Sequence, residues 1–306
     1  MDMTVISLIV VSIITAATPL LIAALGELIV EKSGVLNLGI EGMMVIGAVT
    51  GFITVQTLGS APLAIVISML SGAALAGIFA FLTLSLQANQ VATGLALTIF
   101  GLGLSSLLGR EFVGMSYEGL PKLEISFLSE LPFLGPILFG HDALVYFSFF
   151  WVWLTFWFLN KTRAGLILRA VGESHSAAHS IGYPVIKIRY LAVLYGGAMS
   201  GLAGAYLSLA YSPMWAEAMT AGRGWIALAL VVFAMWLPSR VLIGAYLFGG
   251  ITILQLHGQS LGIDIPSEFL SMLPYLATIL VLVIISQQNQ SNTKPACLGQ
   301  IFYPSK

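Results

Sequence analysis

The sequence predicts an all-α integral membrane protein with about nine transmembrane helices, within a range of eight to ten. Of its 306 residues, 58% are hydrophobic and only 8% are charged, whereas soluble proteins carry about 25% charged residues. Apolar stretches of about 20 residues, enough to cross a bilayer, recur along the chain. The charges are balanced, with 12 basic and 13 acidic residues, so no nucleic-acid partner is expected.

The predicted spans follow these apolar stretches in chain order. The seventh is the least regular, because its apolar part from Trp225 to Leu237 is too short to cross alone. It needs Gly222, Arg223 and Gly224 to complete a crossing, or it enters only part-way. The nine spans cover residues 3–25, 36–56, 61–86, 91–109, 141–159, 189–210, 221–237, 240–257 and 269–286.

The chain therefore divides into a single transmembrane domain, residues 1–286, and a polar tail, residues 287–306. The tail is predicted to be disordered because it offers little apolar surface to bury. Cys297, the only cysteine of the chain, lies in this tail. A disulfide within one chain is excluded, and no role is expected for the thiol.

The distribution of Lys and Arg sets the predicted orientation, since these residues collect on the cytoplasmic side. If the segment 169–189 is cytoplasmic, nine of the twelve basic residues lie inside and only Arg110, Lys122 and Arg223 lie outside. The reverse orientation would invert that ratio. With nine spans, the N-terminus is then outside and the C-terminus cytoplasmic. The nine inside are Lys32, Lys161, Arg163, Arg169, Lys187, Arg189, Arg240, Lys294 and Lys306.

Small residues indicate where the spans pack together. Helices in lipid approach closely only where side chains are small. The sixth span reads "YGGAMSGLAGAYL", in which Gly197, Gly201 and Gly204 fall on one helix face. We expect these glycines to form a contact with neighbouring spans.

The segment "RAVGESHSAAHSIGYPVIKIR", residues 169–189, is polar between two apolar stretches. Ser174 is a good helix N-cap, Gly182 a natural stop, and Pro184 prevents continuation. A short helix near 174–182 is therefore predicted. Ala177, Ala178 and Ile181 share one of its faces, which a groove on a soluble partner could accept.

Two other interpretations of this helix remain open. It could be an ordinary solvated loop helix. His175 and His179, four residues apart on another face, could also bind a metal, but a site needs a third ligand and Glu173 is the only nearby candidate. We therefore predict no metal site.

Three stretches resemble bacterial ABC-importer permeases of the superfamily that serves branched-chain amino acids, ribose-type sugars and nucleosides. "LRAVGESHSAAHSIGYPVIKIR" followed by "AMSGLAGAYL" is similar to the cytoplasmic coupling segment of the nucleoside and simple-sugar branch. His175, Tyr183 and Pro184 depart from the commoner residues of that segment. "LGELIVEKSGVLNLGIEGMMVIGA" and "MTAGRGWIALALVVFAMWLP" resemble that branch around the second and seventh spans.

The resemblance implies the permease subunit of an ATP-driven importer in a bacterial cytoplasmic membrane. Its partners would be an ABC ATPase subunit that binds ATP and Mg²⁺, a second permease chain (like or unlike itself), and an extracytoplasmic substrate-binding protein, a lipoprotein. Membrane lipid would surround it, and the chain itself would bind no cofactor. Coupling to the ATPase would rest on Gly172, Glu173, Ser174, Ala177, Ala178, Ile181 and Gly182.

A few polar and aromatic residues are candidates for the transport pathway. An ionised residue at the bilayer centre costs about 2.5–3.5 kcal/mol and persists where it has a function or a partner. Glu41 lies inside the second span, four residues after Asn37 and so on its face; a structural acid is the equal alternative. Arg223 lies at the outer end of the seventh span, as a cavity residue or an anchor. Trp215 and Trp225 are interface-belt residues or stacking partners for a ring.

Glu27 and Glu31 are expected in a solvated turn at the inner membrane surface, with a gate or a contact with the ATPase as the alternative. No phosphate-binding loop and no nucleophile–base pair is recognisable, so the chain is not expected to be an enzyme. The alternative function is a secondary transporter or channel for a small polar solute, which would need no ATPase. The substrate stays open between nucleosides and simple sugars, with nucleosides favoured by the resemblance alone.

Overall fold

The computed structural model describes residues 3–123, 134–260 and 294–303, with isolated positions between 269 and 283. Every regular element within this part of the chain is a helix, and its only β interactions are two isolated bridges. The all-α prediction is confirmed. The helices are α1 (Met3–Lys32), α2 (Ile40–Leu58), α3 (Ala61–Ala80), α4 (Gln90–Gly109), α5 (Leu134–Phe139), α6 (Ala143–Lys161), α7 (Arg163–Glu173), α8 (His175–Ser180), α9 (Val185–Tyr206), α10 (Arg223–Phe233) and α11 (Pro238–Ser260).

Seven helical stretches in the described residues are long and apolar enough to cross a membrane. They correspond to the first six predicted spans and the eighth. The seventh predicted span is the 11-residue α10, which at 1.5 Å per residue rises only about 16 Å. Most of the ninth, 269–286, lies outside the described residues. The seven are Ile6–Lys32, Ile40–Leu58, Ala61–Ser85, Gln90–Phe112, Ala143–Lys161, Val185–Tyr211 and Pro238–Leu256.

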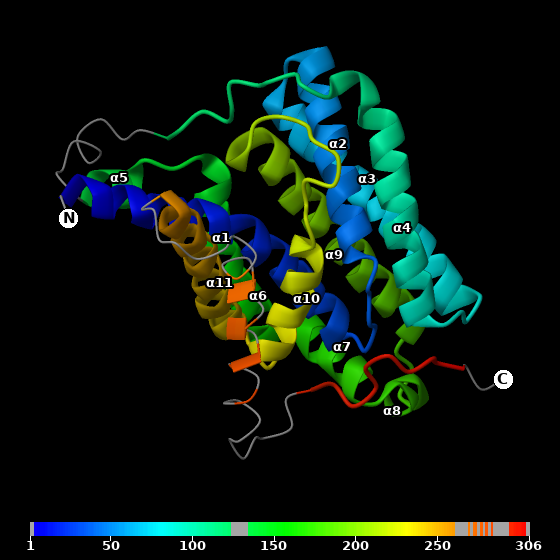
Figure 1. Ribbon diagram of the computed structural model, residues 1–306. Helices are drawn as coiled ribbons and strands as arrows, with labels where there is room; N and C mark the ends of the chain where they lie inside the picture. The colour runs from blue at the N-terminus through cyan, green and yellow to red at the C-terminus, as the bar shows by residue number, and fades with distance from the viewer. Residues whose placement is uncertain are drawn as a thin grey trace.

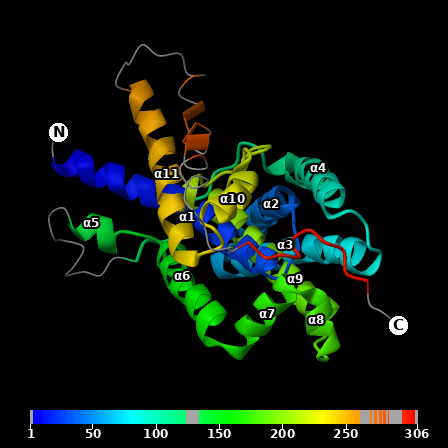
Figure 2. The same cartoon turned by 90° about the horizontal axis from the view of Figure 1, so that it is seen from below.

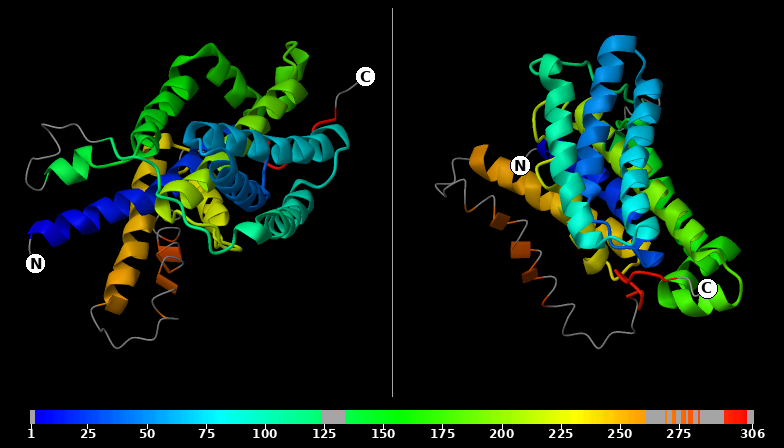
Figure 3. Two further views of the ribbon diagram at one scale, coloured as in Figure 1. Left: turned by 90° about the horizontal axis from the view of Figure 1, so that it is seen from above. Right: turned by 90° about the vertical axis from the view of Figure 1, so that its right-hand side faces the viewer.

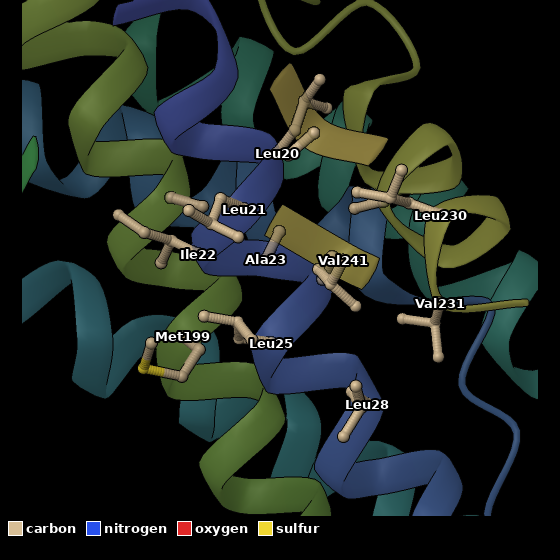
Figure 4. Packing of buried hydrophobic residues seen from close by; sticks show 14 of the residues in the cluster. Leu20, Leu21, Ile22, Ala23, Leu25, Leu28, Met199, Leu230, Val231 and Val241 are labelled. Atoms are coloured by element: carbon tan, nitrogen blue, oxygen red, sulfur yellow. The ribbon is translucent and has the colours of Figure 1, made fainter. Parts of the chain in front are cut away.

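Helices α1, α2 and α9 form the centre of the bundle. In the most apolar stretch of α2 and of α9, 78% of the residues are buried, against 28% in α6 and α11. Figure 4 shows Leu25 of α1 beside Met199 of α9, both within the main cluster of buried apolar residues. The peripheral helices α3, α4, α6 and α11 therefore present their outer faces to lipid or to another subunit (Figures 1 and 3).

The glycines of α9 allow this close packing. A Cβ at Gly201 would fall on the carbonyl oxygen of Ser68 in α3, and a Cβ at Gly204 on that of Met44 in α2. Gly197 likewise faces Gly72 and Ala76 of α3. All three glycines thus lie where backbones approach one another, as small residues do between membrane helices.

The two ends of the bundle differ. Helices α7 and α8 and the segment 294–303 lie at one end (Figure 1), which we call the α8 end. At the opposite end, the strand-like segment before the gap at 124–133 pairs with the segment after α9. There the amide of Tyr117 donates to the carbonyl of Pro213 at 2.9 Å, and Ser116 bridges to Met214.

Candidate functional site

Glu41 lies near the middle of the bundle, although it is only the second residue of α2. A Cβ at the adjacent Gly42 would lie 2.8 Å from Cα of Thr98, which is close to the midpoint of α4 (Gln90–Gly109). Residues 33–39 rise to this depth without forming a helix. Helix α2 therefore begins inside the bundle, later than the predicted start at residue 36.

The Glu41 carboxylate accepts three hydrogen bonds from the segment that begins α10. Oε1 accepts from the Thr220 hydroxyl at 2.5 Å and from the Gly222 amide at 2.9 Å, and Oε2 accepts from the Gly224 amide at 2.6 Å. The first amides of a helix have no partner within it and carry a partial positive charge. A carboxylate from another helix thus caps α10. We call Glu41, Thr220, Gly222 and Gly224 the junction.

Glycine is required at both junction positions of α10. Gly222 has a φ of +79°, which strains any residue with a Cβ. A Cβ at Gly224 would lie 2.7 Å from Cα of Glu41. The same short loop holds Ala218 and Ala221 at φ of +53° and +47°, a costly conformation for residues other than glycine. The hydrogen bonds to Glu41 therefore hold the loop in this strained backbone conformation.

The loop of residues 212–222 and α10 together cross the bundle. The loop starts at the end opposite α8, beside Tyr117, and descends to Glu41. Helix α10 continues toward the α8 end, where the Trp236 indole donates to the Glu31 carboxylate. The seventh crossing is thus half irregular backbone and half helix, and a full helical span over 221–237 is wrong. Irregular backbone at membrane depth is tolerated where it is buried in protein or lines a water-filled cavity.

Arg223 does not lie at the outer end of a span, because its neighbour Gly224 contacts Glu41 near the bundle middle. Its guanidinium donates to the Met219 carbonyl at 3.1 Å and lies 5.2 Å from the ring centre of Tyr211. A cation over an aromatic face is stabilised by the ring's negative surface. Arg223 therefore fastens the loop to the end of α9.

The two tryptophans lie in different surroundings. Trp215 is 1% exposed and packs with Val49 and Phe52, at a place where Gly109 of α4 leaves room for its ring. Trp225 is 46% exposed on α10. Trp215 is therefore a core residue, whereas Trp225 presents its ring on the surface of α10.

Asn37 is fully buried and precedes α2, so it does not share a helix face with Glu41 as predicted. Its side-chain oxygen accepts from the Gly39 amide at 2.9 Å, and its backbone amide donates to Oε1 of Glu27 at 3.4 Å. Asn37 thus shapes the non-helical approach to α2. Because Asn37, Glu41 and Trp215 are each at most 3% exposed, the bundle is closed at their level.

Glu27 and Glu31 are not in a solvated turn, because both are fully buried at the end of α1. Glu27 accepts from the Asn37 amide, and Glu31 accepts from the Trp236 indole. The two acids join the last turn of α1 to the segments before α2 and after α10. Long-range partners of this kind leave no local pattern in the sequence.

The predicted short helix at 174–182 is confirmed as α8. The Ser174 hydroxyl accepts from the Ala177 amide at 3.3 Å, and Gly182, with a φ of +92°, follows its end. The preceding helix α7 was not predicted. Gly172 seats α7 on α1, since a Cβ there would fall on the Lys32 carbonyl.

The exposed face of α8 differs from the predicted one. Ala177 and Ile181 are exposed, Ile181 to 73%, but Ala178 is 2% exposed and packs with Val171, Val185 and Phe302. Glu173 and Gly182 are exposed beside them. Ala178 therefore holds α8 against the protein, and only Ala177 and Ile181 of the three face outward.

Part of the tail is packed, contrary to the predicted disorder of residues 287–306. The Cys297 amide donates to the Gly172 carbonyl at 2.9 Å, and the Gly299 amide donates to the Gly34 carbonyl at 3.1 Å. Phe302 is 8% exposed and lies between the rings of His175 and His179, at centroid distances of 5.2 and 5.3 Å. The segment 294–303, which we call the strap, thus covers the inner side of α8.

Arg189 connects these parts, a role that the sequence did not reveal. It is 1% exposed and donates to the carbonyls of Ser33 and Gln300, both at 3.1 Å. A third nitrogen lies 3.4 Å from Nδ1 of His175. Burial and the nearby Arg189 guanidinium lower the pKa of His175, which favours the neutral ring as the hydrogen-bond acceptor. Helix α8, the strap and the start of α9 are therefore held as one unit.

The sequence of this chain is similar to a family of membrane permeases and to several of its members. Residues 9–284 match the family described as branched-chain amino acid transport system, permease component. A putative glucose ABC transporter permease of Haloferax volcanii is 42% identical over 94% of this chain and 95% of its own. A guanosine ABC transporter permease of Bacillus subtilis is 35% identical over 91% and 92%, and a nucleoside ABC transporter permease of Lactococcus lactis is 34% identical over 90% and 92%.

These matches cover nearly the whole chain and include the junction, α8 and every described membrane helix. The chain belongs to the family of branched-chain amino acid transport system permease components, and it is the permease, not an enzyme, of an ABC transporter.

Proposed function

We propose that this chain moves nucleosides or simple sugars into the cell across the cytoplasmic membrane, driven by ATP hydrolysis in a separate subunit. The relatives named for glucose, guanosine and nucleosides support this substrate class. These solutes share a polyhydroxylated sugar ring. A binding protein outside the membrane, a lipoprotein, delivers the solute, and a second permease chain completes the translocation path.

The observation that carries the proposal is the construction of α8. Its outer residues Ala177 and Ile181 are exposed, while Arg189 and Phe302 fix its inner side to α9 and the strap. A partner that binds the exposed residues would transmit its displacement to α9 and, through the small-residue contacts, to α2 and α3. Rigid-body rocking of packed helices in this way opens a path alternately to each side.

The α8 end faces the cytoplasm in this proposal. Lys32, Lys161, Arg163 and Lys187 end or begin helices there, in agreement with the positive-inside rule. The N-terminus is then outside and the C-terminus inside. ATP and Mg²⁺ bind the ATPase subunits, and no cofactor is assigned to this chain.

Ile181→Asp tests the proposal. A carboxylate on the exposed face should abolish co-purification of the ATPase and lower ATP-dependent uptake of guanosine and glucose at least tenfold. Membrane insertion and thermal unfolding should not change, because Ile181 is 73% exposed. Leu123→Asp, at a residue 48% exposed at the opposite end, is the matched control. Uptake that survives ATP depletion would instead support a secondary transporter.

A further inference from the structure

An apolar groove of about 610 Å³ opens on the surface near the α8 end. Its volume lies within the roughly 300–1,000 Å³ typical of small-molecule sites. Residues of α6, α7 and α9 line it together with Ile29 of α1, and Figure 2 shows these helices from the α8 end. Apart from Thr155, the residues that line its interior are apolar or aromatic, for example Leu154, Phe158, Ile167, Ile188 and Leu191.

The polar groups at the deep end of the groove are already paired. The Trp151 indole donates to the Tyr195 hydroxyl at 2.6 Å. An occupant of the interior therefore meets hydrocarbon surface and gains no hydrogen bond there. That favours an alkyl chain over a polar solute.

The mouth of the groove is cationic. Lys187, Tyr183 and Pro184 line it at the α8 end, and Lys187 is exposed. Arg163 adjoins the lining residue Ala164, and Lys161 ends the neighbouring helix; both are exposed. No carboxylate occurs among the lining residues. Basic sites between membrane helices attract anionic lipid headgroups.

The length of the groove fits one leaflet. Lys187 at the mouth and Tyr195 at the deep end are eight residues apart on α9, which is about 12 Å of helix. Half of a hydrocarbon core about 30 Å thick is about 15 Å. A lipid whose phosphate lies at Lys187 can thus place an acyl chain along the groove down to Tyr195.

We propose that this groove binds an anionic phospholipid, with an acyl chain between α6, α7 and α9 and the phosphate at Lys187 and Arg163. Tyr183 and Pro184 belong to the short segment that joins α8 to α9. The lipid therefore contacts the connection through which α8 displaces α9. The charge of the lipid headgroup would therefore influence how firmly the segment between α8 and α9 is held.

Native mass spectrometry of the full-length chain in detergent tests the proposal, with added phosphatidylglycerol or phosphatidylcholine. The wild type should retain more phosphatidylglycerol. Lys187→Glu should lower that retention about fivefold or more, since one basic residue near an anionic headgroup contributes about 1 kcal/mol. Ala164→Trp should lower retention of both lipids by filling the groove.

Matched controls lie outside the groove. Ala170→Trp changes another exposed alanine of α7, and Lys122→Glu reverses an exposed charge at the opposite end; neither should change retention. Thermal unfolding identifies a misfolded variant, and Lys187→Glu tests the headgroup site even if Ala164→Trp does not fold. Equal retention of the two lipids, or no effect of Lys187→Glu, would overturn the proposal. A chain that is dimeric in detergent, and that Ala164→Trp makes monomeric without lowering lipid retention, would also overturn it, because the groove would then be a subunit interface.

Discussion

A single carboxylate determines how two helices meet inside this membrane protein. Glu41 is 3% exposed, yet its charge faces two backbone amides and a hydroxyl at the start of α10. Hydrogen bonds to a buried charge are worth about 1.5–3 kcal/mol each in stability. The junction is therefore a structural contact in the closed bundle, and any opening that separates α2 from α10 must break it.

Glu41→Gln should weaken the junction. The amide group of glutamine would point N–H hydrogens toward the Gly222 or Gly224 amide, so at least one buried donor would lose its acceptor. We expect a loss of about 2 kcal/mol or more in stability, seen as a lower unfolding temperature, together with impaired uptake. Glu217→Gln, at an exposed position of the same loop, should change neither. An unchanged unfolding temperature for Glu41→Gln would show that the cap is unimportant.

At the scale of elements, the strap and α8 pack together as one structural unit. Phe302 lies between His175 and His179, and the Cys297 amide is bonded to α7. A polar segment that contributes one buried ring and several backbone hydrogen bonds can therefore be ordered without an apolar pattern. The strap limits how far α8 can move relative to α9.

Phe302→Ala should release the strap. Removing a buried phenylalanine side chain costs about 3–5 kcal/mol in a closed core, and less at this partly open site. The expected result is faster proteolytic cleavage between residues 287 and 303 and weaker co-purification of the ATPase. Tyr303→Ala, at a neighbour 65% exposed, is the control. Equal cleavage rates for Phe302→Ala and the wild type would contradict the packing.

The sequence could predict those features that depend on residues close together in the chain, and not those that depend on contacts between distant residues. Hydropathy located the long helices, and Ser174 and Gly182 delimited α8 because caps and stops act on adjacent residues. Helix α7 was missed because its apolar residues, such as Leu168 and Val171, alternate with charges in a segment judged to be a loop. The partners of Glu41, 179 to 183 residues away, and the strap depend on tertiary contacts that no local pattern records.

At the scale of the whole molecule, α1, α2 and α9 form a closed centre and the other helices surround it. The loop 212–222 and α10 together count as one crossing of the membrane. Helix α10 alone is too short to be counted as a span, yet the predicted orientation depends on counting this crossing. If that crossing and the predicted span at 269–286 are both counted, the proposed orientation puts the two termini on opposite sides of the membrane.

Cysteine labelling can test this orientation, because Cys297 is the only cysteine. In a Cys297→Ser background, Leu123→Cys should react with a membrane-impermeant maleimide added to intact cells. Ile181→Cys should react only after the cells are opened. Both side chains are exposed, so accessibility in the folded protein is not limiting. The opposite result would reverse the proposed topology.

The strap also has a practical consequence for anyone who isolates this protein. A purification tag inserted after Tyr303 would adjoin Phe302 and therefore lie close to α8, which we assign to the contact with the ATPase. We expect such a fusion to leave the protein folded but to prevent the ATPase from binding, whereas a tag at the N-terminus would leave the exposed face of α8 free.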